Sequence, residues 1–305
     1  MPSLRDYRDR IASVKSTRKI TSAMKMVAAA KLKKAQDQAE ASQPYAQAMA
    51  AMLSRVAEGI TEGTGPALLT GTGDDRRVLL VVVSSDRGLA GGFNANLIRR
   101  VRQEIKHLEN QGKDVKIICV GRKARDLLKR TNKDNILESF TGFTGGKTVD
   151  YTNANTVSEL VIEQFQSGSF DVCKLVYNDF VSVLIQKPRV QQLVPFAMPE
   201  AAESNDNKKD DAKTAVAEAP SSPYSFEPSE EEILNSLLPK NIGVQIFRAL
   251  LDSSAGEQAA RMTAMDNATR NAGDMISDLT LQYNRARQAH ITKELIEIIS
   301  GAEAL

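Results

Sequence analysis

Two glycine-rich segments have the residue types and spacing that come nearest to phosphate chemistry. The first, residues 84–94 (SSDRGLAGGFN), joins an apolar strand-like run to an amphipathic segment, and such a turn exposes backbone N–H groups to an anion. Its glycines, Gly88, Gly91 and Gly92, do not follow the G-x-G-x-x-G spacing, and no Lys-Ser or Lys-Thr pair comes after them. We therefore predict that this segment is a structural turn.

The second segment, residues 142–148 (GFTGGKT), ends like a Walker A phosphate-binding loop. That loop needs a glycine five residues before the glycine of its Gly-Lys-Thr ending. The residue at this position is Thr141, and Gly142 comes one residue too late. The preceding residues, 136–140, are also a poor match to a buried strand. We therefore expect no direct nucleotide binding and no cofactor.

The histidines and cysteines do not form a catalytic or metal-binding set. His107 and His290 lie on separate predicted helices, whereas Cys119 and Cys173 lie in separate apolar strand-like runs. This spacing excludes a zinc ribbon or a CxxC redox pair. No serine or cysteine has an evident general base beside it. The sequence thus predicts no catalytic residues, no metal site and no self-contained enzyme.

Composition excludes several classes of binding protein. Aromatic residues make up 5% of the 305 residues and Trp is absent, which argues against a module that stacks sugars or bases. The net charge of +2 excludes a wholly basic nucleic-acid binder, and without a run of 18 apolar residues we expect no membrane span. Residues 1–57 nevertheless carry a net charge of +7. This basic segment fits a surface that meets acidic protein loops, a solvated face, or a contact with nucleic acid or membrane.

Long helices are predicted at both ends of the chain. Residues 1–57 carry apolar side chains in alternating steps of three and four, and residues 229–305 do the same after a capping box at Ser229. Pro44 and Pro239 should bend the two helices locally. At 1.5 Å per residue the helices would be about 85 Å and 115 Å long, too long for a compact domain.

Between the helices the chain divides into three parts. Residues 58–77 contain five glycines and are predicted to be a loop, and residues 197–228 are polar and predicted to be a flexible insertion or linker. Residues 78–196 alternate strand and helix signals, which predicts a small α/β domain. We expect strands at 78–84, 115–120, 171–178, 181–187 and 190–196, and helices at 94–111, 122–130 and 155–167.

The simplest arrangement is an antiparallel coiled coil of the two terminal helices with the small Rossmann-like α/β domain at its side. Small residues permit the two helices to approach closely: Ala28, Ala29, Ala30, Ala268 and Ala272. Because the C-terminal helix is the longer of the two, part of it must be covered by another protein or by nothing.

Several ordered motifs resemble the gamma subunits of F-type ATP synthases, of the bacterial type without the dithiol regulatory insertion of chloroplast relatives. They are residues 18–32 (RKITSAMKMVAAAKL), 84–94, 260–269 (ARMTAMDNAT), 283–295 (YNRARQAHITKEL) and 300–302 (SGA). One departure is Ala90, where many relatives carry Cys. The resemblance covers nearly the whole chain except the polar insertion.

The resemblance implies a noncatalytic rotor shaft that couples rotation of the membrane c-ring to conformational change in three catalytic beta subunits, for ATP synthesis or hydrolysis. The implied partners are three alpha and three beta subunits, epsilon and the c-ring, and the implied location is the cytoplasmic face of the bacterial inner membrane, as a peripheral protein. The matching positions for contact with beta are Met24, Lys25, Arg261, Gln288 and Thr292. Those for an upper bearing are Leu295, Ile298, Ile299 and Leu305. The alternative is a structural coiled-coil adaptor without energy coupling.

Overall fold

The computed structural model describes residues 3–58, 65–144, 149–196 and 230–303. Its helices are α1 (Leu4–Glu58), α2 (Ala67–Thr70), α3 (Phe93–Asn110), α4 (Arg122–Leu128), α5 (Tyr151–Gln166), α6 (Glu230–Glu303) and a 3-10 turn, η1 (Lys133–Asn135). Its strands are β1 (Arg77–Val83), β2 (Asp114–Val120), β3 (Ile136–Phe140), β4 (Val172–Phe180) and β5 (Gln186–Val194). The predicted polar insertion at 197–228, the end of the Walker-like segment and Leu305 lie outside the described residues.

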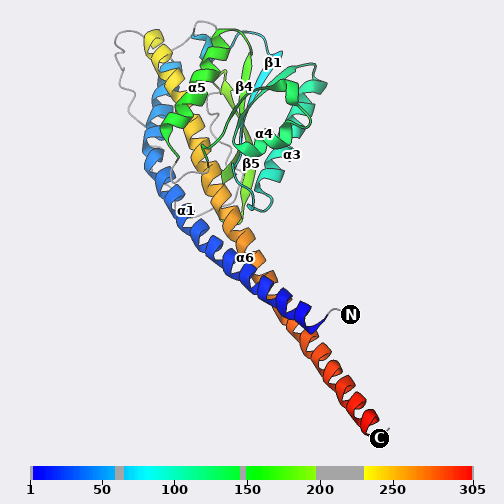
Figure 1. Cartoon of the computed structure of the whole chain (residues 1–305). Coiled ribbons are helices and arrows are strands. Elements are labelled where there is room, and N and C mark those ends of the chain that lie inside the picture. Colours follow the sequence, from blue (N-terminus) through cyan, green and yellow to red (C-terminus); the bar gives the residue numbers. More distant parts are fainter. Residues whose placement is uncertain (1–2, 59–64, 145–148, 197–229, 304–305) are drawn as a thin grey trace, which may run out of the picture.

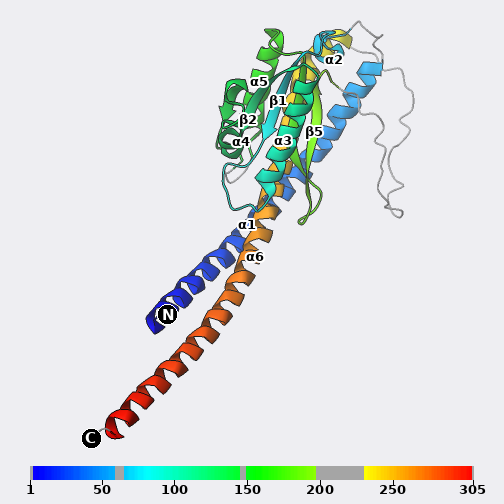
Figure 2. The same ribbon diagram turned by 90° about the vertical axis from the view of Figure 1, so that its right-hand side faces the viewer.

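Helices α1 and α6 form a two-helix antiparallel shaft, as predicted (Figure 1). Their contacts run in opposite directions along the chain: Leu32 and Ala35 pack with Ala255 and Ala259, whereas Met49 packs with Leu238. α1 has 55 residues and α6 has 74, so α6 extends well beyond the N-terminus of α1 (Figures 1 and 2). Both helices continue through their internal prolines, Pro44 and Pro239.

The small residues predicted to bring the helices together are not equivalent. Ala28 and Ala272 are buried, at 1% and 7% exposure. Ala29 and Ala268 are half-buried, and Ala30 is exposed, so its place in the predicted seam was wrong. A helix presents residues two apart on different faces, which is why Ala28 and Ala30 cannot both lie in one seam.

The central α/β domain contains a five-stranded sheet in the order β3-β2-β1-β4-β5. β1 pairs in parallel with β2 and β4, β2 pairs in parallel with β3, and β4 pairs antiparallel with β5. β1 lies at the centre, where its six residues 78–83 are all buried. This explains its unbroken apolar sequence, because a central strand of a parallel sheet has both faces covered.

Two strand predictions differ from the structure. Residues 136–140, which match a buried strand poorly and are not among the expected strands, form the edge strand β3, where Leu137 and Glu138 are exposed and the other three residues are half-buried. The two strands expected at 181–187 and 190–196 are a turn followed by the single strand β5. The turn is closed by paired backbone hydrogen bonds between Ser182 and Ile185.

Helices cover both faces of the sheet, and one of them belongs to the shaft. α3 and α4 pack on one face, whose core includes Val82, Leu97 and Ile117. α5 and α6 pack on the other, where Ile246 and Leu250 of α6 meet the strands. The α/β domain is therefore built directly onto the shaft, and α6 is shared by the two cores.

Candidate functional site

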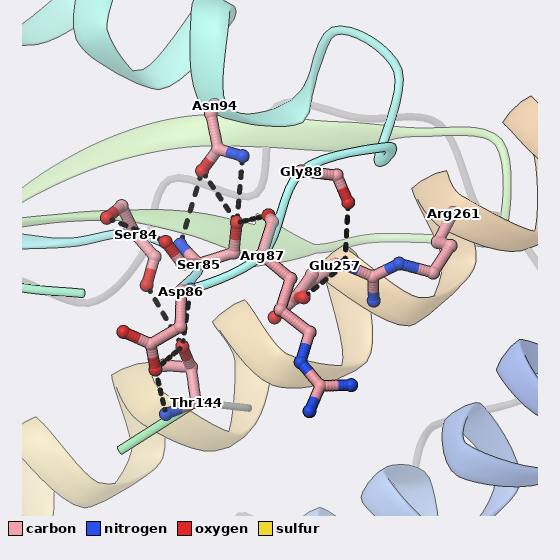
Figure 3. Close-up of polar contacts among 9 residues, drawn as sticks. All are labelled: Ser84, Ser85, Asp86, Arg87, Gly88, Asn94, Thr144, Glu257 and Arg261. Carbon is pink, nitrogen blue, oxygen red and sulfur yellow. Dashed lines mark hydrogen bonds and ion pairs between the residues drawn. The ribbon is translucent and has the colours of Figure 1, made fainter. Parts of the chain in front are cut away.

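The glycine-rich turn after β1 is filled by its own side chains (Figure 3). The Ser85 hydroxyl donates to the carbonyl of Arg87 at 2.7 Å and accepts from Asn94 Nδ2 at 2.8 Å. The backbone N–H of Ser85 donates to Asn94 Oδ1 at 3.2 Å. These bonds join the end of β1 to the first turn of α3. The side chains of Ser85 and Asn94 therefore bond to each other and to the turn itself.

The carboxylate of Asp86 accepts hydrogen bonds from the loops that follow the parallel strands, which is where a bound anion would be expected. Its Oδ2 accepts from the backbone N–H of Gly142 at 3.0 Å and from the Thr144 hydroxyl at 3.1 Å. Its Oδ1 accepts from the N–H of Arg122 at the start of α4, at 3.0 Å. One carboxylate thus links the loops after β1, β2 and β3. Part of the Walker-like segment therefore binds an anion, and that anion is Asp86 (Figure 3).

An arginine of α6 that forms a buried ion pair within its own helix also binds this loop. Arg261 Nη2 lies 2.6 Å from Glu257 Oε1, and the two side chains are 11% and 1% exposed. The same Nη2 donates to the carbonyl of Gly88 at 3.1 Å (Figure 3). Burial raises the pKa of Glu257, and the neighbouring Arg261 opposes that rise. The ion pair lies within α6, and it is the hydrogen bond from Arg261 to Gly88 that links α6 to the loop after β1.

Polar pairs also cross between the helices of the shaft. Lys25 Nζ lies 2.6 Å from Asp266 Oδ1, and this hydrogen bond lowers the pKa of Asp266. The Thr269 hydroxyl lies 2.7 Å from that of Thr21. Further along, Arg8 donates to the Tyr283 hydroxyl at 2.8 Å and its guanidinium lies 5.4 Å from the ring centre. These pairs fix the register of the shaft as far as Tyr283.

The positions predicted to contact beta fall into two groups. Met24 and Arg261 both line an apolar cleft of 520 Å³ beside the junction, and Lys25 is next to them along α1. Gln288 and Thr292 are exposed on the part of α6 beyond Tyr283. The structure thus brings three of the five together and places the other two near the free end of α6.

The apolar positions predicted to form a bearing are also on this free end. Leu295, Ile298 and Ile299 are exposed by 56%, 69% and 50%. Ile291 and Ile296 share this exposure, at 55% and 57%. The end of α6 is therefore an apolar surface without cover from the described part of the chain, as its length relative to α1 predicted.

Sequence reasoning did not identify Asp86, Glu257 or Asp266 as important. Glu257 stands four residues before Arg261, which is the spacing of an ion pair on one helix face, so it could have been found. The contacts of Asp86 with Arg122 and Gly142, and that of Asp266 with Lys25, join residues 36 to 241 positions apart in the chain and leave no local signal.

The two histidines pair with residues four positions later in the chain, and the two cysteines are buried in the sheet. His107 lies 3.0 Å from the side-chain nitrogen of Gln111, and His290 lies 3.3 Å from Glu294. Both cysteines are buried, and burial raises the pKa of Cys119 to about 12. Among the described residues, His, Cys, Asp and Glu form no group of three that could hold a metal. No helix in the described ranges is both long and apolar enough to cross a membrane.

Comparison with known proteins confirms the predicted family. Residues 3–305 match the family model described as ATP synthase. The chain is 55% identical to an ATP synthase gamma chain from Acidiphilium cryptum and 53% identical to one from Rhodospirillum rubrum, in each case over 100% of both chains.

Solved structures show the same fold. The chain is 28% identical to a chain in the central stalk/c-ring structure of Tetrahymena thermophila mitochondrial ATP synthase, with a TM-score of 0.57 over 82% of this chain and 99% of that one. A chain of the Euglena gracilis mitochondrial ATP synthase gives a TM-score of 0.65 at 20% identity, over 99% of this chain and 94% of that one. The chain belongs to the ATP synthase gamma chain family.

Proposed function

We propose that this gamma chain is the central rotor shaft of an ion-translocating F-type ATP synthase. It is a noncatalytic subunit that couples rotation of the membrane c-ring to conformational change in the three catalytic beta subunits. The single observation that carries the proposal is the shape of α6. One helix of 74 residues runs from the core of the α/β domain, along α1, to an unpaired apolar end.

A shaft must transmit torque without slipping against the domain that receives it. α6 crosses from domain to shaft as one unbroken helix, so the main path for torque is covalent. The hydrogen bond from Arg261 to Gly88 adds a second link between the shaft and the loop after β1. Like Arg261, Ser254 and Gln258 are buried polar residues on this part of α6. Such a junction resists twisting because a packed core deforms little.

We further propose that alpha and beta subunits, three of each, surround the shaft. Met24, Lys25, Gln288 and Thr292 are the positions for direct contact with beta. Arg261 acts in the same region, and its hydrogen bonds to Glu257 and Gly88 support a role in holding the loop at residues 84–94 against the shaft. The exposed apolar end, with Leu295, Ile298, Ile299 and Leu305, turns in an upper bearing. An apolar surface suits rotation because its contacts are non-directional.

At the opposite end, the α/β domain and the adjoining part of the shaft are proposed to meet epsilon and the c-ring. The location that we propose is the cytoplasmic face of the bacterial inner membrane, with the chain as a peripheral protein. The solved relatives support the proposed partners, because those chains come from structures of a central stalk with c-ring and of F1 with c-ring.

Reconstitution tests the proposal against the adaptor alternative. Alpha and beta subunits are assembled with and without this chain, and rotation of a probe attached to the α/β domain is followed during ATP hydrolysis. We expect a complex with six larger nucleotide-binding subunits and a probe that rotates. A chain that binds the complex while its probe stays still would support a static adaptor and contradict the rotor.

A further inference from the structure

A cleft lined by both polar and apolar side chains lies apart from the junction, between α1, the β4–β5 hairpin and the first third of α6. It has a volume of about 330 Å³, at the lower end of the range of ~300–1,000 Å³ found for small-molecule sites. Ala46 of α1 leaves room on one side, and Tyr177 of β4 lies on another. The cleft owes its existence to the small side chains of α1 at this level.

The charged side chains that line this cleft are all positive. Arg189 from β5 and Arg248 from α6 both line it, and none of its described lining residues is a carboxylate. Each arginine has an acidic neighbour outside the cleft, but the closest nitrogen-to-oxygen distances are 3.9 Å to Asp179 and 4.0 Å to Asp252. Neither distance is that of a hydrogen bond. Both guanidinium groups therefore keep donors for another anion, and their side chains are 55% and 65% exposed.

Asn241, one of the residues that line the cleft, carries a buried amide group. This residue is 4% exposed, and its Nδ2 has no hydrogen-bond partner within the described ranges. A buried amide left without a partner is unfavourable, so an acceptor brought by a ligand would relieve a cost that the folded chain already bears.

A short chain of hydrogen bonds directs another donor toward the same space. The Tyr177 hydroxyl donates to Gln191 Oε1 at 3.3 Å, and Gln191 Nε2 donates to Gln245 Oε1 at 2.7 Å. Because Gln245 uses its oxygen as an acceptor, its NH2 group is the end of the chain. Gln191 and Gln245 both line the cleft.

We propose that this cleft binds a small organic oxyanion, a carboxylate or phosphate attached to an apolar group. The two guanidinium groups match the planar, bidentate geometry that carboxylates and phosphates accept. The apolar part would lie against Val244 and Phe196, which also line the cleft. This site is separate from the surfaces of the proposed rotor contacts, and its ligand would link the state of the α/β domain to a metabolite.

Calorimetric titration of the purified full chain tests the site with three probes: phenyl phosphate, benzoate and inorganic phosphate. We expect phenyl phosphate or benzoate to bind, and inorganic phosphate to bind more weakly because it lacks the apolar part. The tighter of the first two identifies the anion. Arg189→Gln and Arg248→Gln should each weaken that binding about tenfold, as expected for loss of a charge-assisted hydrogen bond.

The matched control is Arg99→Gln, which removes an exposed arginine of α3 and changes the net charge equally. It should leave the affinity unchanged. Absence of binding by all three probes would overturn the proposal, as would equal weakening by Arg99→Gln, which would indicate attraction by overall charge.

Asn241→Ala separates a ligand contact from a structural role. It should weaken binding severalfold while the Tm of the free chain stays the same or rises, because the unpaired amide is gone. A fall in Tm with unchanged affinity would show that Asn241 serves only the fold and would contradict its place in the site. Occupation of the cleft by a side chain of another subunit in the assembled complex would likewise overturn the small-anion assignment.

Discussion

Among the glycines that the structure describes, Gly121, between β2 and α4, leaves the least space for a side chain. Its φ is +105°, and a Cβ built on it would lie 2.3 Å from the carbonyl oxygen of Ser84. Ser84 is held in place, because its hydroxyl accepts a hydrogen bond from the N–H of Ala124 at 2.8 Å. We expect Gly121→Ala to lower the free energy of unfolding by about 3 kcal/mol or more, since backbone strain and a clash act together. Thermal unfolding of the full chain measures it.

Gly112→Ala is the matched control. Gly112 also has a positive φ, +74°, but no atom lies within 4 Å of the position that a Cβ would take. Only the backbone cost of about 1 kcal/mol should appear. Equal losses for both substitutions would mean that the close approach to Ser84 contributes nothing.

The carboxyl group of Asp252 gives stability an uncommon dependence on pH. Burial raises its pKa from 3.8 to about 6, and Arg248 opposes this only in part. In the unfolded chain the group ionises near pH 4, so the cost of burying the charge begins there and is complete above pH 6. We expect Asp252→Asn to stabilise the chain by about 2 kcal/mol at pH 7.5 and to have no effect below pH 4. Urea unfolding at several pH values measures this.

Asp171→Asn should do the reverse. Its hydrogen bonds to Arg77 hold the pKa of Asp171 down at about 2, so its stabilising effect is present above pH 4 and is lost as pH falls toward 2. The two substitutions remove one carboxylate each, and a similar response from both would contradict the different environments assigned to them.

At the scale of elements, the close packing of α1 on α6 depends on alanines. Ala259 has no exposed surface and packs with Leu32 and Ala35 in the seam. We expect Ala259→Leu to destabilise the chain by about 1–3 kcal/mol, because three extra carbon atoms force the helices apart. Thermal unfolding measures the loss. Ala289→Leu, at an exposed position of the same helix, should change stability by less than about 0.5 kcal/mol.

An element could be predicted from the sequence when most of its residues are buried, because its apolar side chains then form a recognisable run. β1 is fully buried and its sequence shows it, whereas β3 is an edge strand with mixed exposure and lacks an apolar run. α5 begins at Tyr151, four residues before the predicted start, where Asp150 caps it by accepting from the N–H of Thr152. The cap was visible in the sequence, but the polar residues that follow it concealed the helical pattern.

The candidate site was predictable only in its positions. The motifs around Met24 and Arg261 drew attention to two segments whose side chains line one cleft. The partner of Arg261 on the other side of the junction, Gly88, is 173 residues away and is brought there by packing of α6 on the sheet. No local pattern contains that information.

At the scale of the whole molecule, α6 has two different environments. Up to Tyr283 it is accompanied by α1, and the register is held by Lys25–Asp266 and Arg8–Tyr283. Beyond that point it continues alone (Figure 2). A single helix with exposed isoleucines is costly in water, so its stability depends on the sleeve proposed to surround it. The partners proposed to contact this part of α6 during rotation are thus the same ones that would bury its apolar side chains.

Gln288 lies in this unaccompanied part and is expected to matter for coupling and not for folding. Its side chain is exposed, and its carbonyl keeps the hydrogen bond from the Thr292 hydroxyl when the side chain is shortened. We expect Gln288→Ala to lower the rate of ATP synthesis by reconstituted complexes about fivefold, the effect of losing one hydrogen bond of about 1 kcal/mol to beta. The Tm of the chain should not change. Gln282→Ala, at an exposed position six residues earlier, should leave synthesis intact. Normal synthesis by the Gln288→Ala complex would show that this position does not contact beta.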